Sequence, residues 1–417
     1  QKTAAILSYV GQGFASNDLI YDLAAASFIQ IDRDEETKYK YEAVYGRLNY
    51  NWHKKYIVNL TGRRDGSSRF GPGRKFSNFG AVGAAWVFSE EAFFKNSNWL
   101  YTGKLRGSYG STGNDQIGDY GYLDTYTVSG TPYGGIIGIG PTQLYNPNLG
   151  WEINKKGSLA LELGVWDNSV SLTAEWYKSR SGNQLVGIPL PYTTGFPSVQ
   201  ANLGAIVGNR GWEISLSTVN IKNDDFNWTT DFNITIPRNE LVAFPGLENS
   251  TYANQFVIGE PITIKKVFHY TGIDPETGIY QFEDYNGDGN ISAPDDQQYT
   301  EDLAPEFYGG ISNVLKYRNW NLSFFFQFSK QKAYNQWYSA SPAGTMGNQP
   351  TDVLDHWENT GDNAQTQLYT SGYNVEATNA FYNFISSDAA ISDASYIRLK
   401  NLALSYAVPI DKVAAKI

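Results

Sequence analysis

Many short runs of this sequence alternate apolar and polar residues one by one. The run FNWTTDFNITI begins at Phe226 and places Trp228, Phe232, Ile234 and Ile236 on the same parity, with polar residues between them. Because successive side chains of a strand point to opposite faces, the run predicts a strand with an apolar face and a polar face. A tilted strand of about eleven residues is also long enough to cross a bilayer.

The connections between these runs alternate between very short and very long. Short turns lie at 53–55, 166–169, 223–225 and 318–319. Long polar, Gly-rich stretches lie at 11–41, 65–77, 111–155, 180–208, 237–306 and 330–394, and 89–101 is of intermediate length. Short turns at one end and long loops at the other are typical of outer-membrane β-barrels, whose apolar groups face lipid and whose polar groups face a wet lumen. The pattern predicts about twelve spanning strands, the last near 396–406.

Composition excludes several classes of protein. The 417 residues are 41% hydrophobic, yet no apolar stretch approaches the length of a transmembrane helix. The net charge of −10, without a basic stripe, argues against nucleic acid as a partner. The chain has no cysteine and therefore no disulfide and no thiolate metal site. Its three histidines are far apart in sequence, and no hydrolase or phosphate-loop motif is present, so we expect no enzyme activity.

A soluble or surface-attached β-rich glycan-binding protein is the alternative interpretation, because β-sandwiches and propellers also alternate. Two features favour the membrane barrel. The runs reach nine to eleven residues, longer than the usual strand of about five or six. Aromatic residues gather at strand ends, as Tyr50, Trp52 and Tyr56 do beside one turn, and this placement is typical of a girdle at a membrane boundary. A glycan hydrolase is a weaker alternative, since it needs two carboxylates in one cleft.

Five strings resemble, in the same order, strings of the SusC/RagA-like family of TonB-dependent outer-membrane transporters from Bacteroidota. They are YGRLNYN at 45–51, RRDGSSRFG at 63–71, LRGSYGSTGN at 105–114, NLG with NRGWE at 202–213, and SYIRLKN at 395–401. Each string alone is weakly specific, and the resemblance depends on their shared order along nearly the whole chain.

The resemblance implies an all-β fold, an antiparallel transmembrane β-barrel in which residues 1–417 are part of a 22-stranded barrel domain. It implies a place in the outer membrane, in contact with its lipid, with 237–306 and 330–394 as extracellular loops. It also implies import of oligosaccharides or oligopeptides, a SusD/RagB-like surface lipoprotein as a lid, and TonB acting through an N-terminal region. A signal peptide, a TonB box and a plug domain are expected before this segment and further strands after it, so the chain is expected to be a fragment.

One stretch, 284–295, matches the spacing of an EF-hand-type calcium loop. The expected oxygen ligands are the side chains of Asp284, Asn286 and Asp288, the carbonyl of Asn290, Ser292 directly or through water, and Asp295 in place of the usual Glu. Gly289 permits the sharp turn that lets these groups converge. The alternative is a polar loop whose Asn-Gly and Asp-Gly pairs only make turns. If bound, calcium is expected to stiffen the loop and not to catalyse.

The long loops also carry aromatic residues among small polar ones. Tyr334, Trp337, Tyr338 and Trp357 are candidates for stacking on a sugar ring or a peptide side chain. The alternative is that these rings pack the loop against the barrel rim or a partner. In the string at 63–71, Asp65 and Arg69 are expected to pair with each other and to order a surface loop.

Overall fold

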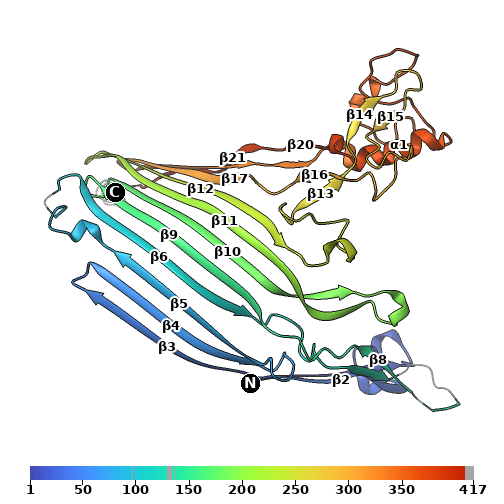
Figure 1. The fold of residues 1–417 in the computed structure, drawn as a ribbon, viewed down its shortest axis with the longest axis horizontal. Coiled ribbons are helices and arrows are strands. Elements are labelled where there is room, and N and C mark those ends of the chain that lie inside the picture. Colours follow the sequence, from blue (N-terminus) through green and yellow to red (C-terminus); the bar gives the residue numbers. More distant parts are fainter. Residues whose placement is uncertain (96, 129–133, 137, 409–417) are drawn as a thin grey trace, which may run out of the picture.

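The computed structural model describes residues 1–95, 97–128, 134–136 and 138–408. Its main feature is one antiparallel sheet of eleven strands, which is strongly curved (Figure 1). The strands, from one edge of the sheet to the other, are β3 (Tyr41–Trp52), β4 (Tyr56–Ser67), β5 (Phe76–Trp86), β6 (Leu100–Asn114), β9 (Glu152–Val165), β10 (Val170–Pro189), β11 (Ser198–Lys222), β12 (Phe226–Ala243), β17 (Phe307–Tyr317), β18 (Trp320–Lys330) and β21 (Tyr396–Tyr406). Neighbours in this list are hydrogen-bonded, and none of the described helices is long and apolar enough to cross a membrane.

The remaining elements are short or lie outside this sheet. Four small two-stranded sheets pair β7 (Thr125–Val128) with β8 (Ile139–Gln143), β13 (Ile264–Val267) with β16 (Tyr299–Asp302), β14 (Tyr270–Ile273) with β15 (Tyr280–Phe282), and β19 (Lys332–Tyr334) with β20 (Ile391–Asp393). A longer ribbon pairs β1 (Lys2–Gln12) with β2 (Phe28–Tyr39). The helices are α1 (Val375–Ile385) and the 3-10 turns η1 (Asn17–Leu19), η2 (Leu23–Ala25), η3 (Phe88–Glu90), η4 (Tyr192–Thr194), η5 (Leu247–Asn249), η6 (Gln336–Ser339), η7 (Thr351–Leu354) and η8 (Asp388–Ala390).

The register of the sheet confirms the predicted apolar face. Phe232 pairs with Ile311, and Ile311 pairs with Phe326, so these three side chains share one face. On the same face Leu159 and Leu402 are more than half exposed, and no second sheet covers them in the part of the chain described. A soluble sandwich would bury this face in a dry core. Its exposure therefore rejects the sandwich and fits a wall that faces lipid.

Two predictions about the strands need correction. Within the described residues the sheet has eleven strands, where the pattern predicts about twelve. The stretch 180–208 is not a long loop, because β10 continues to Pro189 and β11 begins at Ser198. The sequence predicts a loop here because glycines and polar residues break the alternation of this hairpin. Its backbone ladder nevertheless continues, with one register shift between Gly182 and Gln184.

The short turns gather at one end of the sheet (Figure 1). His53 and Lys54 have φ of 52° and 60°, the left-handed conformation of a type I′ turn, which Lys55 N closes by donating to the Trp52 carbonyl at 3.0 Å. Beside this turn the rings of Trp52 and Tyr56 lie 5.6 Å apart, as the predicted girdle requires.

Glu91 joins three elements at this same end. Its carboxylate accepts hydrogen bonds from Tyr56 Oη at 2.6 Å, Trp86 Nε1 at 3.2 Å and Lys55 Nζ at 3.0 Å. These donors lower the pKa of Glu91 from 4.5 to about 2. The stabilisation is therefore fully present above pH 4.5 and is lost as the pH falls towards about 2.

We expect Glu91→Gln to lower the stability of the folded chain at pH 7 and to remove the part of its acid lability that lies between pH 4.5 and about 2. Urea unfolding of the full-length protein in detergent, repeated across this pH range, measures both effects. The neighbouring exposed Glu90, changed to Gln, is the matched control. An unchanged pH profile in Glu91→Gln would show that the three donors do not hold the carboxylate in solution.

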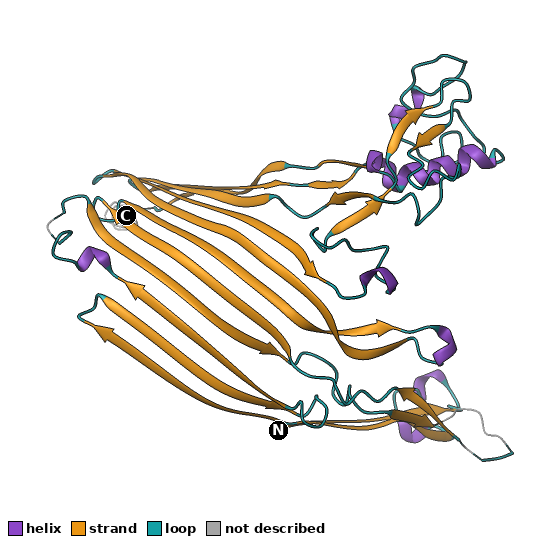
Figure 2. Cartoon of the chain, in the orientation of Figure 1, coloured by secondary structure: helices purple, strands orange, loops and turns teal. Residues whose placement is uncertain are grey.

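The two longest loops pack together into one lobe at the other end of the sheet. Figure 2 shows α1 and the small strands gathered there. Tyr280, from the first loop, stacks on Phe384 of α1, from the second, with ring centroids 4.2 Å apart. Helix α1 places Ala377, Ala380, Phe381 and Phe384 on one buried face at helical spacing, and the side chain of Asn374 caps its first turn.

Candidate functional site

The polar face of the sheet carries a connected set of charges on three neighbouring strands. Arg106 of β6 donates to Glu162 of β9 at 2.6 Å and to Glu175 of β10 at 2.7 Å. Lys104 donates to Glu162 at 3.1 Å. We call these four residues the lumenal charge network. Their parity is opposite to that of the exposed leucines, so the network lies on the face that a closed barrel would turn inward.

The same network explains a pairing that is unfavourable in isolation. Glu175 lies directly opposite Glu213 of β11, and like charges at such positions repel each other. Arg106 reaches Glu175 from the other side and supplies a compensating charge. The face therefore holds fixed groups of both signs close together, a surface suited to polar or zwitterionic cargo and not to apolar molecules.

Loop residues at the long-loop end cover part of this polar face. Phe79 of β5 packs with Phe70, Leu149 and Trp151, which come from two connections far apart in sequence. Trp151 also donates from Nε1 to the carbonyl of Lys75 at 2.9 Å. The loops therefore fold over the polar face of the sheet at this end.

The expected pair between Asp65 and Arg69 does not form. Asp65 pairs with Arg63 at 2.7 Å, and Arg69 pairs with Asp119 at 2.9 Å. The guanidinium of Arg69 also lies over the ring of Tyr39, 4.3 Å from its centroid. The prediction failed because Asp119 lies 50 positions further along the chain, and sequence spacing does not show that the fold brings it to Arg69.

The four aromatic candidates lie in the lobe but in two different settings. Trp337 packs edge-on against Phe384 of α1, with centroids 5.8 Å apart. Trp357 lies against Gly278 and donates to the carbonyl of Pro275 at 3.3 Å. Both indoles thus contribute to packing within the lobe.

Tyr334 and Tyr338 form the second setting. Their rings stack with centroids 3.9 Å apart, and Tyr338 is 51% exposed. Among the four candidates only Tyr338 is exposed, and the other three are half-buried.

The predicted calcium loop forms a series of turns around its first and last acids. Asp284 accepts from the backbone nitrogens of Gly287 at 2.8 Å and Gly289 at 2.7 Å. Asp288 accepts from Asn290 N at 2.8 Å, and Asn286 accepts from Asp288 N at 2.9 Å. Asn290 lies in the exposed stretch of the loop.

At the end of the loop, Asp295 is exposed and the next residue, Asp296, turns inward. Its carboxylate accepts from the backbone nitrogens of Ser292, Tyr285 and Asn286, and these bonds lower its pKa. The donor set of carboxylate, amide and carbonyl oxygens suits a hard cation such as calcium. In the described part of the chain, however, no three acidic or histidine side chains converge at metal-binding separation.

Two features of the molecule were not predicted. The lumenal charge network was missed, although the parity of Arg106, Glu162 and Glu175 was available as a signal. The packing of the two loops into one lobe could not be predicted from local sequence, because its contacts join residues about a hundred positions apart.

Comparisons with known proteins give a consistent result. A search of protein-family models finds no match. The chain is 31% identical over 397 residues to TonB-dependent receptor P3 of Formosa agariphila, covering 88% of this chain and 38% of that protein. It is 27% identical over 387 residues to TonB-dependent receptor SusC of Bacteroides thetaiotaomicron, covering 87% of this chain and 37% of that protein. A solved structure of the RagAB peptide transporter matches with a TM-score of 0.78 and 25% identity, over 96% of this chain and 45% of the matched chain.

These matches define the chain as wall strands of an antiparallel β-barrel of the outer membrane, as predicted. More particularly, the resemblance to SusC/RagA-like TonB-dependent transporters is confirmed. The chain spans less than two fifths of the length of the curated relatives described above. Those relatives are receptors and transporters, which agrees with the expectation that the chain is not an enzyme.

Proposed function

We propose that this chain forms part of the wall of a TonB-dependent importer that carries oligosaccharides or oligopeptides across the outer membrane. The observation that carries the proposal is the single curved sheet with an exposed apolar face and a charged face, together with the match of the RagAB peptide transporter to 96% of this chain. The long loops, 237–306 and 330–394, lie on the extracellular side in this proposal, because long loops are extracellular in such barrels. The backbone edges of β3 and β21 pair with further strands, since bilayers do not tolerate open edges.

A SusD/RagB-like surface lipoprotein covers the extracellular opening in this proposal. The lobe that unites the two longest loops is the element suited to contact it, because it stands clear of the sheet at the long-loop end (Figure 1). TonB acts through the N-terminal region of the full-length protein, and release of cargo is conformational work without covalent chemistry.

Deletion of the TonB box from the full-length protein tests the proposal. Uptake of labelled oligopeptides and oligosaccharides is measured in cells that carry the intact or the deleted form at equal abundance in the outer membrane. We expect the deletion to abolish uptake of one class of oligomer. Uptake that persists after the deletion would refute energised import and leave a passive pore.

The stacked pair Tyr334 and Tyr338 is proposed as a contact for cargo, because aromatic faces bind sugar rings and peptide side chains. Tyr338→Ala is expected to weaken binding of the transported oligomer without unfolding the lobe. Trp337→Ala and Trp357→Ala separate the packing role, since both are expected to loosen the lobe itself. Binding equal to that of the wild-type protein in all three variants would remove Tyr338, Trp337 and Trp357 from the cargo site.

Calcium at the loop 284–295, with Asp296 beside it, is proposed as a structural ion. Asp284, Asn286 and Asp288 would hold it by side-chain oxygens, together with the Asn290 carbonyl and, directly or through water, Ser292. An extracellular site of this kind has a dissociation constant on the order of 10⁻⁴–10⁻³ M. Calcium at ten times that value is expected to stabilise the lobe by about 1.4 kcal/mol.

Asp288→Ala is expected to remove this calcium-dependent stabilisation, measured as thermal unfolding with calcium and with a chelator. Asp295→Asn and Asp296→Asn then show which acid closes the loop, since only the closing acid affects calcium affinity. A wild-type protein equally stable with calcium and with chelator would refute the site.

A further inference from the structure

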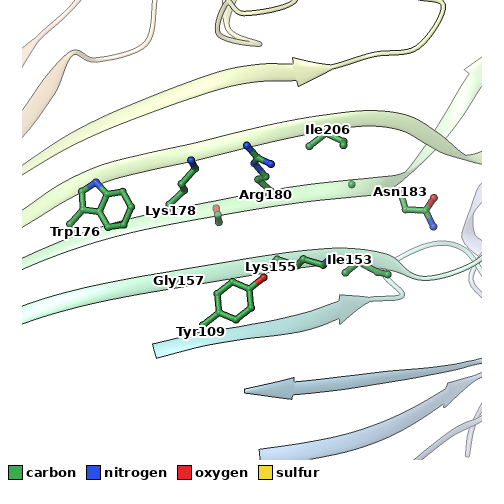
Figure 3. A pocket seen from close by; sticks show the side chains of 11 residues that line it. Tyr109, Ile153, Lys155, Gly157, Trp176, Lys178, Arg180, Asn183 and Ile206 are labelled. Carbon is green, nitrogen blue, oxygen red and sulfur yellow. The ribbon is translucent and has the colours of Figure 1, made fainter. Parts of the chain in front are cut away.

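The apolar face of the sheet has a hollow at its long-loop end that the import function does not use. The hollow has a volume of about 700 Å³ and lies over β6, β9 and β10 (Figure 3). Tyr109 and Trp176 flank it, and Lys155, Lys178 and Arg180 border it. Glycines on its floor, among them Gly157 and Gly182, open space between the larger side chains.

The register places this hollow on the lipid-facing side of the wall. Tyr109 pairs with Gly157, and Gly157 pairs with Lys178, so all three lie on one face. Leu159 lies two positions from Gly157 along β9, on the same face. It is 52% exposed and pairs with Trp176. The lumenal charge network has the opposite parity, so cargo in the lumen does not reach these cations.

The height of the hollow on the wall follows from the strand geometry. Val170 begins β10 at the short-turn end, and Lys178 and Arg180 lie eight and ten residues further along. At ~3.3 Å per residue and a tilt of ~40°, this is a rise of about 20–25 Å. The apolar band of an outer-membrane barrel is ~25 Å tall, so the two cations lie at its outer boundary. Trp176 lies two residues nearer the short-turn end than Lys178, at the depth of an aromatic girdle, and Tyr109 is level with Lys178 in the ladder.

The cations around the hollow have no acidic partner. Within the described residues, Lys155, Lys178, Arg180 and Arg210 have no carboxylate oxygen within 4.0 Å, whereas Lys104 and Arg106 on the other face are fully paired. Arg210 pairs with Lys178 across the ladder and borders an adjoining smaller hollow. Glu240 is the acid that borders this second hollow, so positive charge predominates.

We propose that this hollow binds a phosphorylated, multi-acyl lipid of the outer leaflet. Its phosphate groups contact Lys155, Lys178, Arg180 and Arg210, and its acyl chains lie along the apolar surface of Leu159 and Trp176 below them. Unpaired cations directly above an apolar surface complement a molecule with an anionic head and hydrocarbon chains. The orientation of the wall used here rests on the proposed function, but the lipid site does not depend on which cargo is carried.

The test uses the full-length protein with the substitutions Lys178→Gln, Arg180→Gln and Arg210→Gln combined. Binding of diphosphorylated lipid A is measured by native mass spectrometry and by the shift in unfolding temperature in detergent. Dephosphorylated lipid A and inorganic phosphate are the comparison probes. Because each surface cation contributes about fivefold to binding of an anionic lipid, we expect the triple variant to bind diphosphorylated lipid A about a hundredfold more weakly.

Lys155→Gln and Lys156→Gln form a matched pair, since these neighbours lie on opposite faces of β9. We expect only Lys155→Gln to weaken lipid binding. Equal binding of phosphorylated and dephosphorylated lipid A to the wild-type protein would overturn the proposal. Stabilisation by inorganic phosphate as large as that by lipid A would also overturn it, because the site would then bind a free anion. Uptake of labelled oligomers is measured separately, so loss of transport with lipid binding intact would count against the import function alone.

Discussion

Gly309→Val is expected to prevent normal assembly of the sheet in the full-length protein. A Cβ atom at Gly309 would meet the backbone carbonyl oxygen of Asn233 on β12 and would lie 2.7 Å from the ring of Phe328 on β18. Phe328 has little room to move, because it lies between Phe232 and Phe307, with ring centroids 6.1 and 6.3 Å away. A clash with backbone cannot be relieved by a change of rotamer, so we expect a loss of about 3 kcal/mol.

The measurement is the fraction of folded barrel in the outer membrane, followed by urea unfolding of the purified protein in detergent. Gly62→Val is the matched control, since Gly62 lies on the same apolar face and a Cβ there has no neighbour within 4 Å. Equal folded fractions for the two variants would mean that β12, β17 and β18 are less closely packed than described here.

Phe381→Ala is expected to unfold the lobe formed by the two long loops while leaving the sheet intact. Phe381 is 1% exposed and belongs to a cluster that joins α1 to Tyr280 and, through it, the second long loop to the first. Removing a buried phenyl ring costs about 3–5 kcal/mol, which is a large part of the stability of a lobe this small. Because the cluster contains residues of both loops, we expect 237–306 and 330–394 to become sensitive to protease together.

Limited proteolysis with identification of the cut sites measures this effect, and the yield of folded barrel shows whether the sheet is retained. Tyr382→Ala is the control, because Tyr382 is next to Phe381 on the same helix but is 54% exposed. Cleavage confined to 330–394 in Phe381→Ala would show that the two loops fold independently.

Much of the wall was predictable because β-strands encode their faces in sequence parity. The apolar parity of Phe226, Trp228 and Phe232 predicts one face of β12, and that face extends through the ladder to Phe326. The turn at 53–55 and its flanking aromatic residues also followed from the sequence, since a hairpin turn is decided by a few adjacent residues.

Other features were not predictable for a specific physical reason in each case. The strands through 180–208 were not predictable because glycines and a register shift between Gly182 and Gln184 interrupt the alternation that marks a strand. The partners of Asp65 and Arg69, and the inward turn of Asp296 in place of Asp295, depend on backbone paths that residue spacing does not specify.

The sequence by itself determined that this chain is a series of two-faced strands joined by short turns at one end and long loops at the other. Alternation along a strand is a local property of the sequence. The polarity of the side chains on each face determines whether that face meets lipid or water. Only the tertiary structure decided which charges meet on the polar face, which cations remain unpaired on the apolar face, and that the two longest loops share one core. Those contacts join residues tens to hundreds of positions apart, so they depend on the register of the whole sheet.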